Sequence, residues 1–244
     1  MTQTVISVDH VVQNYGKSVV LHNVDLTVEK GEIIGFLGPS GSGKTTLVKT
    51  IVGMNRPKSG SVTVHGIPMP SLEAVKSIGY MAQSDALYED LSGMENLMFF
   101  ARLYGMNRKE ARQNAIRVLE LTELHFDAKK AVKFYSGGMK RRLSLCIAMI
   151  HNPDLLILDE PTVGIDPVLR NIFWKEFKRL SSLGTTILIT THVMDEAEHC
   201  DRLAFIRNGE ITAIGQPEGL KILSGQDTIE GAFLYYGGNG EAIS

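Results

Sequence analysis

The chain has 244 residues, 25 of them Lys or Arg and 27 Asp or Glu, and a formal net charge of −2. This length suits one α/β domain, or one domain with an inserted subdomain, and the even charge balance excludes a global basic field for nucleic acid. Two cysteines cannot build a disulfide framework or a zinc cluster, so a reducing cytoplasm fits. No apolar run approaches the roughly 20 residues of a bilayer-spanning helix, and no signal peptide is evident. We therefore expect any membrane role to come through a partner.

The first 66 residues predict antiparallel strands around a central strand. Residues 4–12, 18–28 and 61–66 are short, β-branched and partly alternating in polarity. Tyr15 is expected in the turn between the first two strands. An aromatic ring there can stack on a nucleotide base, although the same tyrosine also fits a half-exposed turn.

Residues 33–45 carry the most specific motif. Ile33–Leu37 is an apolar run of strand length, and no helix breaker follows Lys44. Between them, GPSGSGKT at 38–45 matches G-x-x-x-x-G-K-[ST] at every fixed position. Its glycines let backbone N–H groups point at phosphate oxygens, and the positive end of the following helix adds to that field. Lys44 then reaches the β- and γ-phosphates, and Thr45 is placed to bind Mg²⁺. The segment predicts a site for a nucleoside triphosphate.

The middle of the chain predicts a short strand and then helices. The strand IGYMAQ ends at Gln83, whose amide carbonyl can bind a metal, although such a glutamine on its own is more often a solvated loop residue. From 85 to 125 the pattern is helical, and Asn107 with Glu110 resembles a capping box that opens a second helix. The first helix has an apolar stripe made of Met94, Leu97, Met98, Ala101 and Leu103 or Tyr104. The adjacent Phe99 and Phe100 widen this stripe and hint at a partner surface.

Three later segments place polar residues where helices begin or strands end. YSGGMKRR at 135–142 predicts a helix capped by Ser136, whose glycine amides can face an anion or simply begin the helix. A buried strand at 155–158 ends in Asp159-Glu160, where one acid can hold Mg²⁺ and the other can polarise water; a charged turn is the alternative. A helix beginning at Asp166-Pro167 and ending at Gly184 precedes another buried strand, 186–190, which ends in Thr191-His192.

Residues 203–206 and 210–214 complete the pattern as a hairpin. Three strand ends then carry polar chemistry: the glycine-rich loop, the acid pair and the histidine. Because an open parallel sheet binds ligands at the carboxyl ends of its strands, we expect the three to meet at one edge.

The ordered set of motifs over residues 5–215 resembles the ATP-binding subunit of ABC transporters. The resemblance rests on Tyr15, a Walker A segment at 38–45, Gln83, a signature at 135–139, a Walker B segment at 155–160, Asp166 and a switch histidine, His192. It implies an α/β fold: a P-loop NTPase core with a mostly parallel sheet, an N-terminal antiparallel β subdomain and an inserted helical subdomain at about 84–152. The ABC domain is then expected over 1–222, with a short C-terminal tail over 223–244.

The resemblance also implies roles for single residues. The nucleotide would be bound by Tyr15, Gly38, Pro39, Ser40, Gly41, Ser42, Gly43, Lys44, Thr45 and Thr46. Mg²⁺ would be held by Thr45, Gln83 and Asp159. Glu160 would be the general base, and His192 would sense the γ-phosphate. Ser136, Gly137 and Gly138 would complete the site of a second chain in trans, and Asp166 would lie in a loop at the dimer interface.

Several segments resemble the drug- and polysaccharide-exporter branch of this family. They are YSGGM in place of LSGGQ, the run at 164–167, MDEAE at 194–198 and the late IEGAFLYYGG. Met139 cannot make the hydrogen bonds of the usual glutamine, so we expect no ligand role for it. The resemblance implies a homo- or heterodimer of ATP-binding subunits, peripheral on the cytoplasmic face of the membrane, that drives a separate permease for export.

The same residues argue against several other classes of nucleotide-binding protein. Repair ATPases of the family carry a coiled coil or zinc insert, but Lys44 and Ser136 are only 136 − 44 = 92 residues apart. GTPases read guanine with N-K-x-D, which is absent. A regulatory module that does not hydrolyse nucleotide would not need the acid pair and the histidine, and all three residues are present in this chain. A soluble family member acting in cofactor or cluster assembly, without a permease, stays open.

Overall fold

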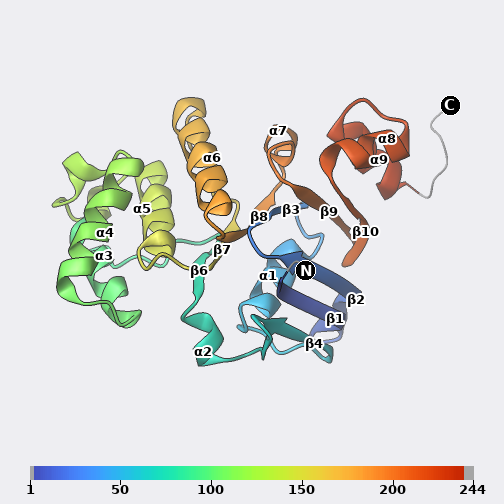
Figure 1. Ribbon diagram of the computed structural model, residues 1–244, viewed down its shortest axis with the longest axis horizontal. Helices are drawn as coiled ribbons and strands as arrows, with labels where there is room; N and C mark the ends of the chain where they lie inside the picture. The colour runs from blue at the N-terminus through green and yellow to red at the C-terminus, as the bar shows by residue number, and fades with distance from the viewer. Residues whose placement is uncertain (1–2, 239–244) are drawn as a thin grey trace.

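The computed structural model describes residues 3–238, which form two sheets with helices around them (Figure 1). The smaller sheet is antiparallel, in the order β2-β1-β4-β5, and its strands are β1 (Thr4–Tyr15), β2 (Ser18–Glu29), β4 (Ser59–Val64) and β5 (Ile67–Pro68). The predicted antiparallel strands are therefore present, with two corrections. Tyr15 is the last residue of β1, and the turn consists of Gly16 and Lys17. Strand β4 ends at Val64, because His65 and Gly66 turn the chain with φ of +51° and +76°.

The larger sheet is mostly parallel, as the resemblance implied. Its order is β10-β9-β3-β8-β7-β6, and only the edge strand β10 runs antiparallel to its neighbour. The strands are β3 (Ile33–Leu37), β6 (Ile78–Met81), β7 (Leu155–Asp159), β8 (Thr186–Thr191), β9 (Arg202–Arg207) and β10 (Glu210–Gly215). Every residue of β3, β7 and β8 is buried, which is why these strands read as unbroken apolar runs.

Two hydrophobic cores lie on opposite faces of this sheet. Ile33 and Leu37 of β3 belong to the core shared with the helices, whereas Ile34 and Phe36 belong to the core shared with the antiparallel sheet. The split follows from the side-chain period of two along a strand. Because helices pack on one face of this sheet and the antiparallel sheet packs on the other, its strands are held in place, and the carboxyl ends of the parallel strands lie along one edge.

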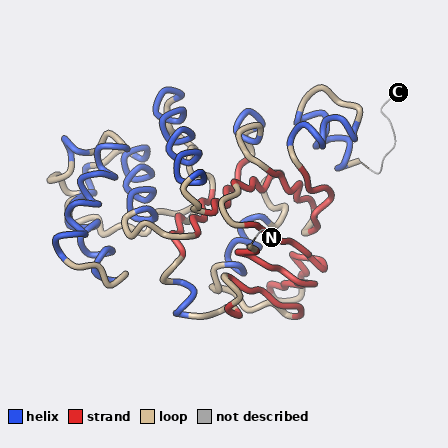
Figure 2. Tube along the Cα trace, in the orientation of Figure 1, coloured by secondary structure: helices blue, strands red, loops and turns tan. Residues whose placement is uncertain are grey.

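The helices lie around the sheets, and two sets of them stand together (Figures 1 and 2): α8 with α9 at the right, and a larger set at the left. One group, at the left of both views, holds α3, α4 and α5. The helices are α1 (Lys44–Ile51), α2 (Leu72–Val75), α3 (Gly93–Leu103), α4 (Arg108–Leu121), α5 (Gly137–Met149), α6 (Pro167–Ser182), α7 (Met194–Ala197), α8 (Pro217–Ser224) and α9 (Ile229–Gly237). Short 3₁₀ turns lie at His125–Asp127 and Val132–Phe134. No helix within residues 3–238 has the length and apolar character to cross a bilayer.

The helix caps and stripes follow the sequence with small differences. A full capping box begins α3 at Ser92 and Glu95. At α4, Asn107 accepts the Glu110 N–H at 2.9 Å, but the Glu110 carboxylate meets the Asn107 side chain, so the predicted box is half formed. In the α3 stripe, Leu103 is exposed, whereas Tyr104 packs inward and stacks on His151.

The C-terminal residues that the structure describes form helices. The predicted boundary after residue 222 falls inside α8, and α9 lies within the predicted tail. Phe233 and Tyr236 of α9 pack on Phe205 of β9, with ring centroids 5.4 and 6.1 Å from it. The division into a domain at 1–222 and a tail at 223–244 stays a prediction, and residues 1–2 and 239–244 lie outside the described residues.

Candidate functional site

Four neighbouring strands bring their polar carboxyl ends to one edge of the large sheet. In the order β3-β8-β7-β6, the strands lead into the glycine-rich loop, His192, the acid pair and Gln83. A cavity of about 210 Å³ opens at this edge, lined by Val20, Ser40, Gly41, Gly43, Lys44, Thr45, Thr46, Gln83 and Glu160. Residues more than 100 positions apart in the chain thus face one space, as expected for a parallel sheet.

The loop from Gly38 to Gly43 has a backbone that only glycine accepts at key points. Gly41 and Gly43 have φ of +78° and +108°, and a Cβ at Gly38 would overlap the carbonyl oxygen of Ile206. In the described part of the chain, no side chain caps the N-terminus of α1. Its first N–H groups therefore have no side-chain acceptor, which together with the helix dipole suits a phosphate.

Lys44 lies at the mouth of this loop and is almost fully buried. Its Nζ donates to the carbonyl oxygens of Gly38 and Pro39 at 2.7 and 2.9 Å. Burial lowers the pKa of Lys44, while Glu160 and Asp159 nearby act to raise it. The buried ammonium group of Lys44 is thus bonded to two neutral carbonyl oxygens, and it can pair with the negative charge of a bound polyphosphate.

Asp159 offers an oxygen atom that the protein leaves unpartnered. The side chain is 1% exposed, and its Oδ1 accepts a hydrogen bond from the Thr190 hydroxyl. Its Oδ2 has no hydrogen-bond partner among the described residues. Leaving such a buried acceptor unmatched costs on the order of 1–3 kcal/mol. Thr45 and Gln83 line the cavity, whereas Asp159 lies at the same sheet edge outside the lining residues; the oxygen donors of the three side chains are of the type that Mg²⁺ prefers.

Glu160 holds its carboxylate in the cavity through a strained backbone. Its φ is +53°, and its N–H donates to the carbonyl and hydroxyl oxygens of Thr190 at 3.1 and 3.0 Å. A non-glycine residue in this region costs on the order of 1–3 kcal/mol, a cost that is concentrated at functional sites. The Glu160 Oε1 lies 3.2 Å from Nδ1 of the half-exposed His192. The acid is thus paired with an imidazole that can hold or orient it.

Arg141 is a buried residue that sequence reasoning missed. Its guanidinium donates to the carbonyls of Ala82 and Gln83 at 2.7 and 3.0 Å, and also to those of Asp159 and Glu160. It therefore ties the loop after β6 to the loop after β7. The sequence signal that could have identified Arg141 is its spacing, because it lies one helical turn before Leu145 on the buried face of α5.

We expect Arg141→Ala to lower the free energy of unfolding by about 3 kcal/mol, because it leaves buried carbonyl groups unpaired. Chemical unfolding in urea measures this change. Lys140→Ala is the matched control: its ion pair with the exposed Glu89 contributes at most about 1 kcal/mol. Equal losses in the two variants would show that the buried carbonyl contacts of Arg141 add nothing.

Several expected site residues do not line the cavity. Tyr15 is half exposed and accepts a hydrogen bond from Asn55 Nδ2 at 2.8 Å. Ser136 caps α5 by accepting the Met139 N–H at 3.2 Å, and Asp166 caps α6 as predicted. With Gly137 and Gly138, these residues are outside the cavity lining of this single chain. A Cβ at Gly138 would approach the Gly164 carbonyl to 3.3 Å, so the signature lies against the loop before α6.

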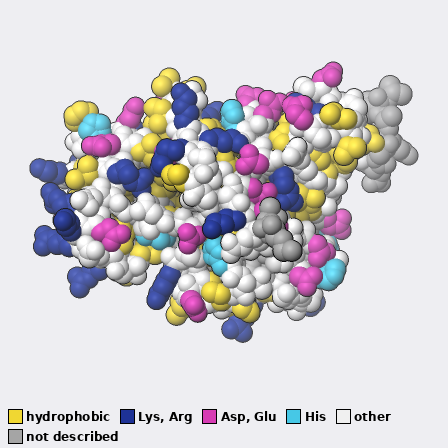
Figure 3. All heavy atoms as spheres, viewed as in Figure 1, with side chains coloured by type: hydrophobic (Ala, Val, Ile, Leu, Met, Phe, Trp, Pro, Cys, Tyr) yellow, Lys and Arg dark blue, Asp and Glu magenta, His cyan; other side chains and the backbone are white. Residues whose placement is uncertain are grey.

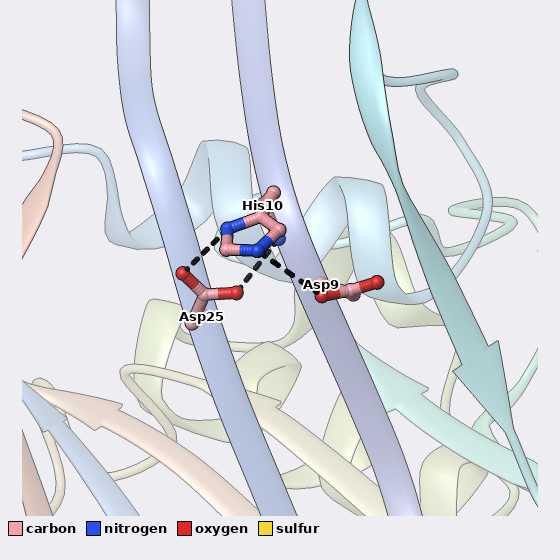
Figure 4. A group of neighbouring side chains, drawn as sticks. All are labelled: Asp9, His10 and Asp25. Carbon is pink, nitrogen blue, oxygen red and sulfur yellow. Dashed lines mark hydrogen bonds and ion pairs between the residues drawn. The ribbon is translucent and has the colours of Figure 1, made fainter.

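A second group with ligand-type side chains lies on the antiparallel sheet (Figure 4). His10 Nδ1 is 3.1 Å from Asp25 Oδ2, and His10 Nε2 is 3.8 Å from Asp9 Oδ1. The Asp25 carboxylate also accepts the His10 N–H at 2.8 Å, at a point where β1 bulges and His10 has φ of +49°. All three residues are exposed and pair with one another, so they hold the bulge and have no part in the cavity.

Comparison with known proteins agrees with this geometry. A model of the ABC transporter family matches residues 21–163. The chain is 42% identical to the linearmycin resistance ATP-binding protein LnrL of Bacillus subtilis over 224 residues, which cover 91% of this chain and 72% of that protein. It is 40% identical to the Nod factor export ATP-binding protein I of Rhizobium etli over 243 residues, 98% of this chain and 76% of the relative.

A solved structure extends the agreement to the fold. It is the dimer of an ATP-binding cassette in a post-hydrolysis state with ADP and Pi, and it superposes with a TM-score of 0.80 at 26% identity, over 86% of this chain and 98% of that one. The family model alone spans more than half of the residues, and it includes the glycine-rich loop and the acid pair. With its phosphate cradle and acid pair at one sheet edge, the chain belongs to the ABC transporter family and is one of its ATP-binding subunits, an ATPase.

Proposed function

We propose that the chain hydrolyses ATP to energise a separate transmembrane permease for export. The observation that carries the proposal is the position of Glu160, in the same cavity as Lys44 and Thr45 and 3.2 Å from His192. This arrangement places a base, a phosphate-binding cation and a metal-binding hydroxyl around one space. The direction of transport is supported by the names of relatives, among them a Nod factor export ATP-binding protein.

In the proposed binding step, the loop over 38–43 and the N-terminus of α1 surround the β- and γ-phosphates. Lys44 exchanges its two carbonyl partners for phosphate oxygens, which strengthens the hydrogen bonds of its ammonium group. Thr46 adds to the lining next to Thr45. Tyr15 would stack on the base from the end of β1, where Asn55 holds its hydroxyl.

The site residues also fit Mg²⁺. Asp159, through its unpartnered oxygen, would hold the ion together with Thr45 and Gln83. When bound, the ion neutralises charge on the β- and γ-phosphates. Arg141 contacts the main-chain carbonyls of both Gln83 and Asp159, so one buried guanidinium fixes two of the three proposed ligand-bearing loops.

In the proposed hydrolytic step, Glu160 accepts a proton from the water that attacks the γ-phosphorus, and ADP and phosphate leave. His192 keeps the Glu160 carboxylate oriented and contacts the γ-phosphate. The left-handed backbone of Glu160, held by Thr190, directs the side chain to the cavity before any substrate arrives. Preorganisation of this kind reduces the reorganisation needed in the transition state.

The proposal includes a second ATP-binding subunit. Ser136, Gly137 and Gly138 begin α5 outside the cavity of their own chain, where their N–H groups are placed to meet the γ-phosphate bound by a partner. Asp166 lies in the loop that approaches this signature, since Gly164 is next to Gly138. One closed dimer would then contain two sites, each built from both chains.

The permease is proposed to dock on the helical group. There, Tyr88 and Phe99 form an exposed edge-to-face pair with ring centroids 4.7 Å apart. A hollow of about 380 Å³ on the same group is lined by Met98, Arg102, Met106, Arg108 and Ala111. Lys and Arg side chains gather over these helices at the left of Figure 3. Apolar and cationic side chains together suit a short amphipathic helix that carries acidic residues.

We expect Phe99→Ala and Phe99→Glu to release the chain from membranes without loss of fold or ATP binding. Phe99 is 37% exposed, whereas Phe100 packs against the core, so Phe99 is the side chain available to a partner. A buried aromatic anchor contributes about 2 kcal/mol or more to binding, which corresponds to about 30-fold in affinity. The measurement is co-sedimentation with membranes from cells that express the native permease.

Phe126→Glu is the matched control, because Phe126 is 90% exposed on the same group of helices and belongs to the 3₁₀ turn His125–Asp127, not to α3. Thermal melting verifies the fold of each variant. If the unaltered chain stays in the soluble fraction of such cells, the permease proposal is wrong, and the alternative of cofactor or cluster assembly without a permease takes its place.

A further inference from the structure

A buried acid outside the cavity joins the segments that carry Glu160 and His192. Glu196 lies on α7 and is 2% exposed. Its Oε1 accepts a hydrogen bond from the Thr162 hydroxyl, and its Oε2 accepts one from the Thr191 hydroxyl at 2.9 Å. Thr162 follows Glu160 by two residues, and Thr191 directly precedes His192. One carboxylate thus connects the loops after two neighbouring strands, β7 and β8.

The hydroxyl of Thr191 fixes the backbone on both sides of His192. It accepts the N–H of Val193 at 3.0 Å while donating its own proton to Glu196. A hydroxyl has one proton, so this donation is possible only if its partner can accept. An ionised carboxylate accepts at both oxygens and can satisfy both threonines at once.

The same carboxylate reaches the loop before α6. Arg170 Nε lies 3.5 Å from Glu196 Oε1, and it is the one cation within ion-pair distance of Glu196 in residues 3–238. Arg170 also donates to the Ile165 carbonyl at 3.3 Å, and the Ile165 N–H donates to the Thr162 carbonyl at 3.1 Å. The contacts of Glu196 therefore extend to Asp166, the residue next to Ile165.

Stability alone does not account for this arrangement. Burying a carboxylate costs free energy, and well-packed apolar residues in place of a buried ion pair are often neutral or stabilising. What the carboxylate supplies is geometry, because two donors from different loops are held at fixed distances from a single acceptor group.

We propose that Glu196 is a positioning residue for ATP hydrolysis, which holds His192 against Glu160 and links both to the loop that ends at Asp166. The inference rests on the roles proposed above for Glu160 and His192. Glu196 lies outside the residues that line the cavity, so it acts through its two threonine contacts. A movement of the Asp166 loop would then reach His192 through Thr162, Glu196 and Thr191.

The test is steady-state ATP hydrolysis by the purified full chain carrying Glu196→Gln. The amide keeps the shape but offers one acceptor oxygen in place of two, so one threonine hydroxyl loses the acceptor for its proton. Misplacement of a catalytic group typically costs up to about 10²-fold, and we expect kcat to fall about 10- to 100-fold. The Kd for ATP should stay within about twofold, because the cavity lining is unchanged. Glu198→Gln, an exposed acid two residues further on, should behave like the unaltered chain.

A double-variant comparison separates positioning from a general structural role. If Glu196 acts through His192, then adding Glu196→Gln to His192→Ala should lower the remaining single-turnover rate by less than about twofold. Multiplicative losses in the double variant would overturn the proposal. So would a normal kcat in Glu196→Gln.

A further pair of variants covers the case in which Glu196→Gln fails to fold. Thr191→Val removes the hydroxyl and should reproduce the loss of kcat, whereas Thr191→Ser retains the hydroxyl and should restore most of it. Equal rates in these two variants would contradict the proposed link. The Glu160→Gln variant tests the proposed function separately. If that variant hydrolyses ATP at the normal rate, the proposed function is wrong, whatever the Glu196 variants show.

Discussion

Glu160→Gln should bind ATP normally and almost cease to hydrolyse it. Glutamine preserves the shape of the side chain in the cavity but cannot accept the proton of the attacking water. Loss of a general base typically lowers the rate by roughly 10²–10⁴. The left-handed φ of +53° is set by the Thr190 contacts to the Glu160 N–H, which the substitution retains. We therefore expect kcat to collapse without loss of fold, as measured by phosphate release at saturating ATP.

Lys44→Ala provides the contrast to this result. Lys44 is the buried cation of the phosphate loop, so its removal should weaken nucleotide binding itself rather than the chemical step alone. Equilibrium binding of a fluorescent ATP analogue distinguishes the two variants. Glu218→Gln, a mostly exposed acid on α8, is the control for a neutral Glu-to-Gln change. An unaltered hydrolysis rate in Glu160→Gln would remove Glu160 from its role.

The second large effect should appear when two inactive variants are mixed. Lys44→Ala damages the phosphate loop, and Ser136→Arg places a bulky cation at the start of α5. In a mixed dimer, one site carries both lesions and the other carries none. We expect ATP hydrolysis to reappear on mixing, because Ser136 lies outside the cavity of its own chain and is proposed to complete the cavity of a partner.

The recovery should depend on the ratio of the two variants and be greatest near equal amounts. Mixed dimers must be shown to form, for example by pulling down one tagged variant with the other in the presence of ATP. If mixed dimers form and activity stays absent, the site is complete within one chain, and the in-trans role of Ser136, Gly137 and Gly138 is wrong.

Much of the site could be predicted because its residues follow directly from strand ends. A buried parallel strand is visible as an apolar run, and a polar residue at its carboxyl end must lie at the ligand-binding edge. Gln83, Asp159 and His192 were all found in this way. The cap at Asp166 was equally visible, since a capping acid followed by proline is a local signal that tertiary contacts do not override.

Arg141 and Glu196 could not be predicted as site residues, because they are held in place by contacts between segments that lie far apart in the chain. Arg141 reads as part of a basic run, and its burial depends on carbonyls at 82–83 and 159–160 that no local pattern connects to it. Glu196 reads as one acid in MDEAE, and only the fold brings Thr162 to it. The choice between Leu103 and Tyr104 stayed open because α3 ends there, and the structure buries Tyr104 and leaves Leu103 exposed.

One measurement tests most directly the proposal that two copies of the chain close on ATP: the mass of Glu160→Gln in solution by light scattering. With ATP, we predict a particle of twice the 26.8 kDa chain mass. With ADP, or for the unaltered chain after ATP is consumed, we predict a single chain. A Glu160→Gln chain that binds ATP yet keeps the mass of one chain would contradict the account.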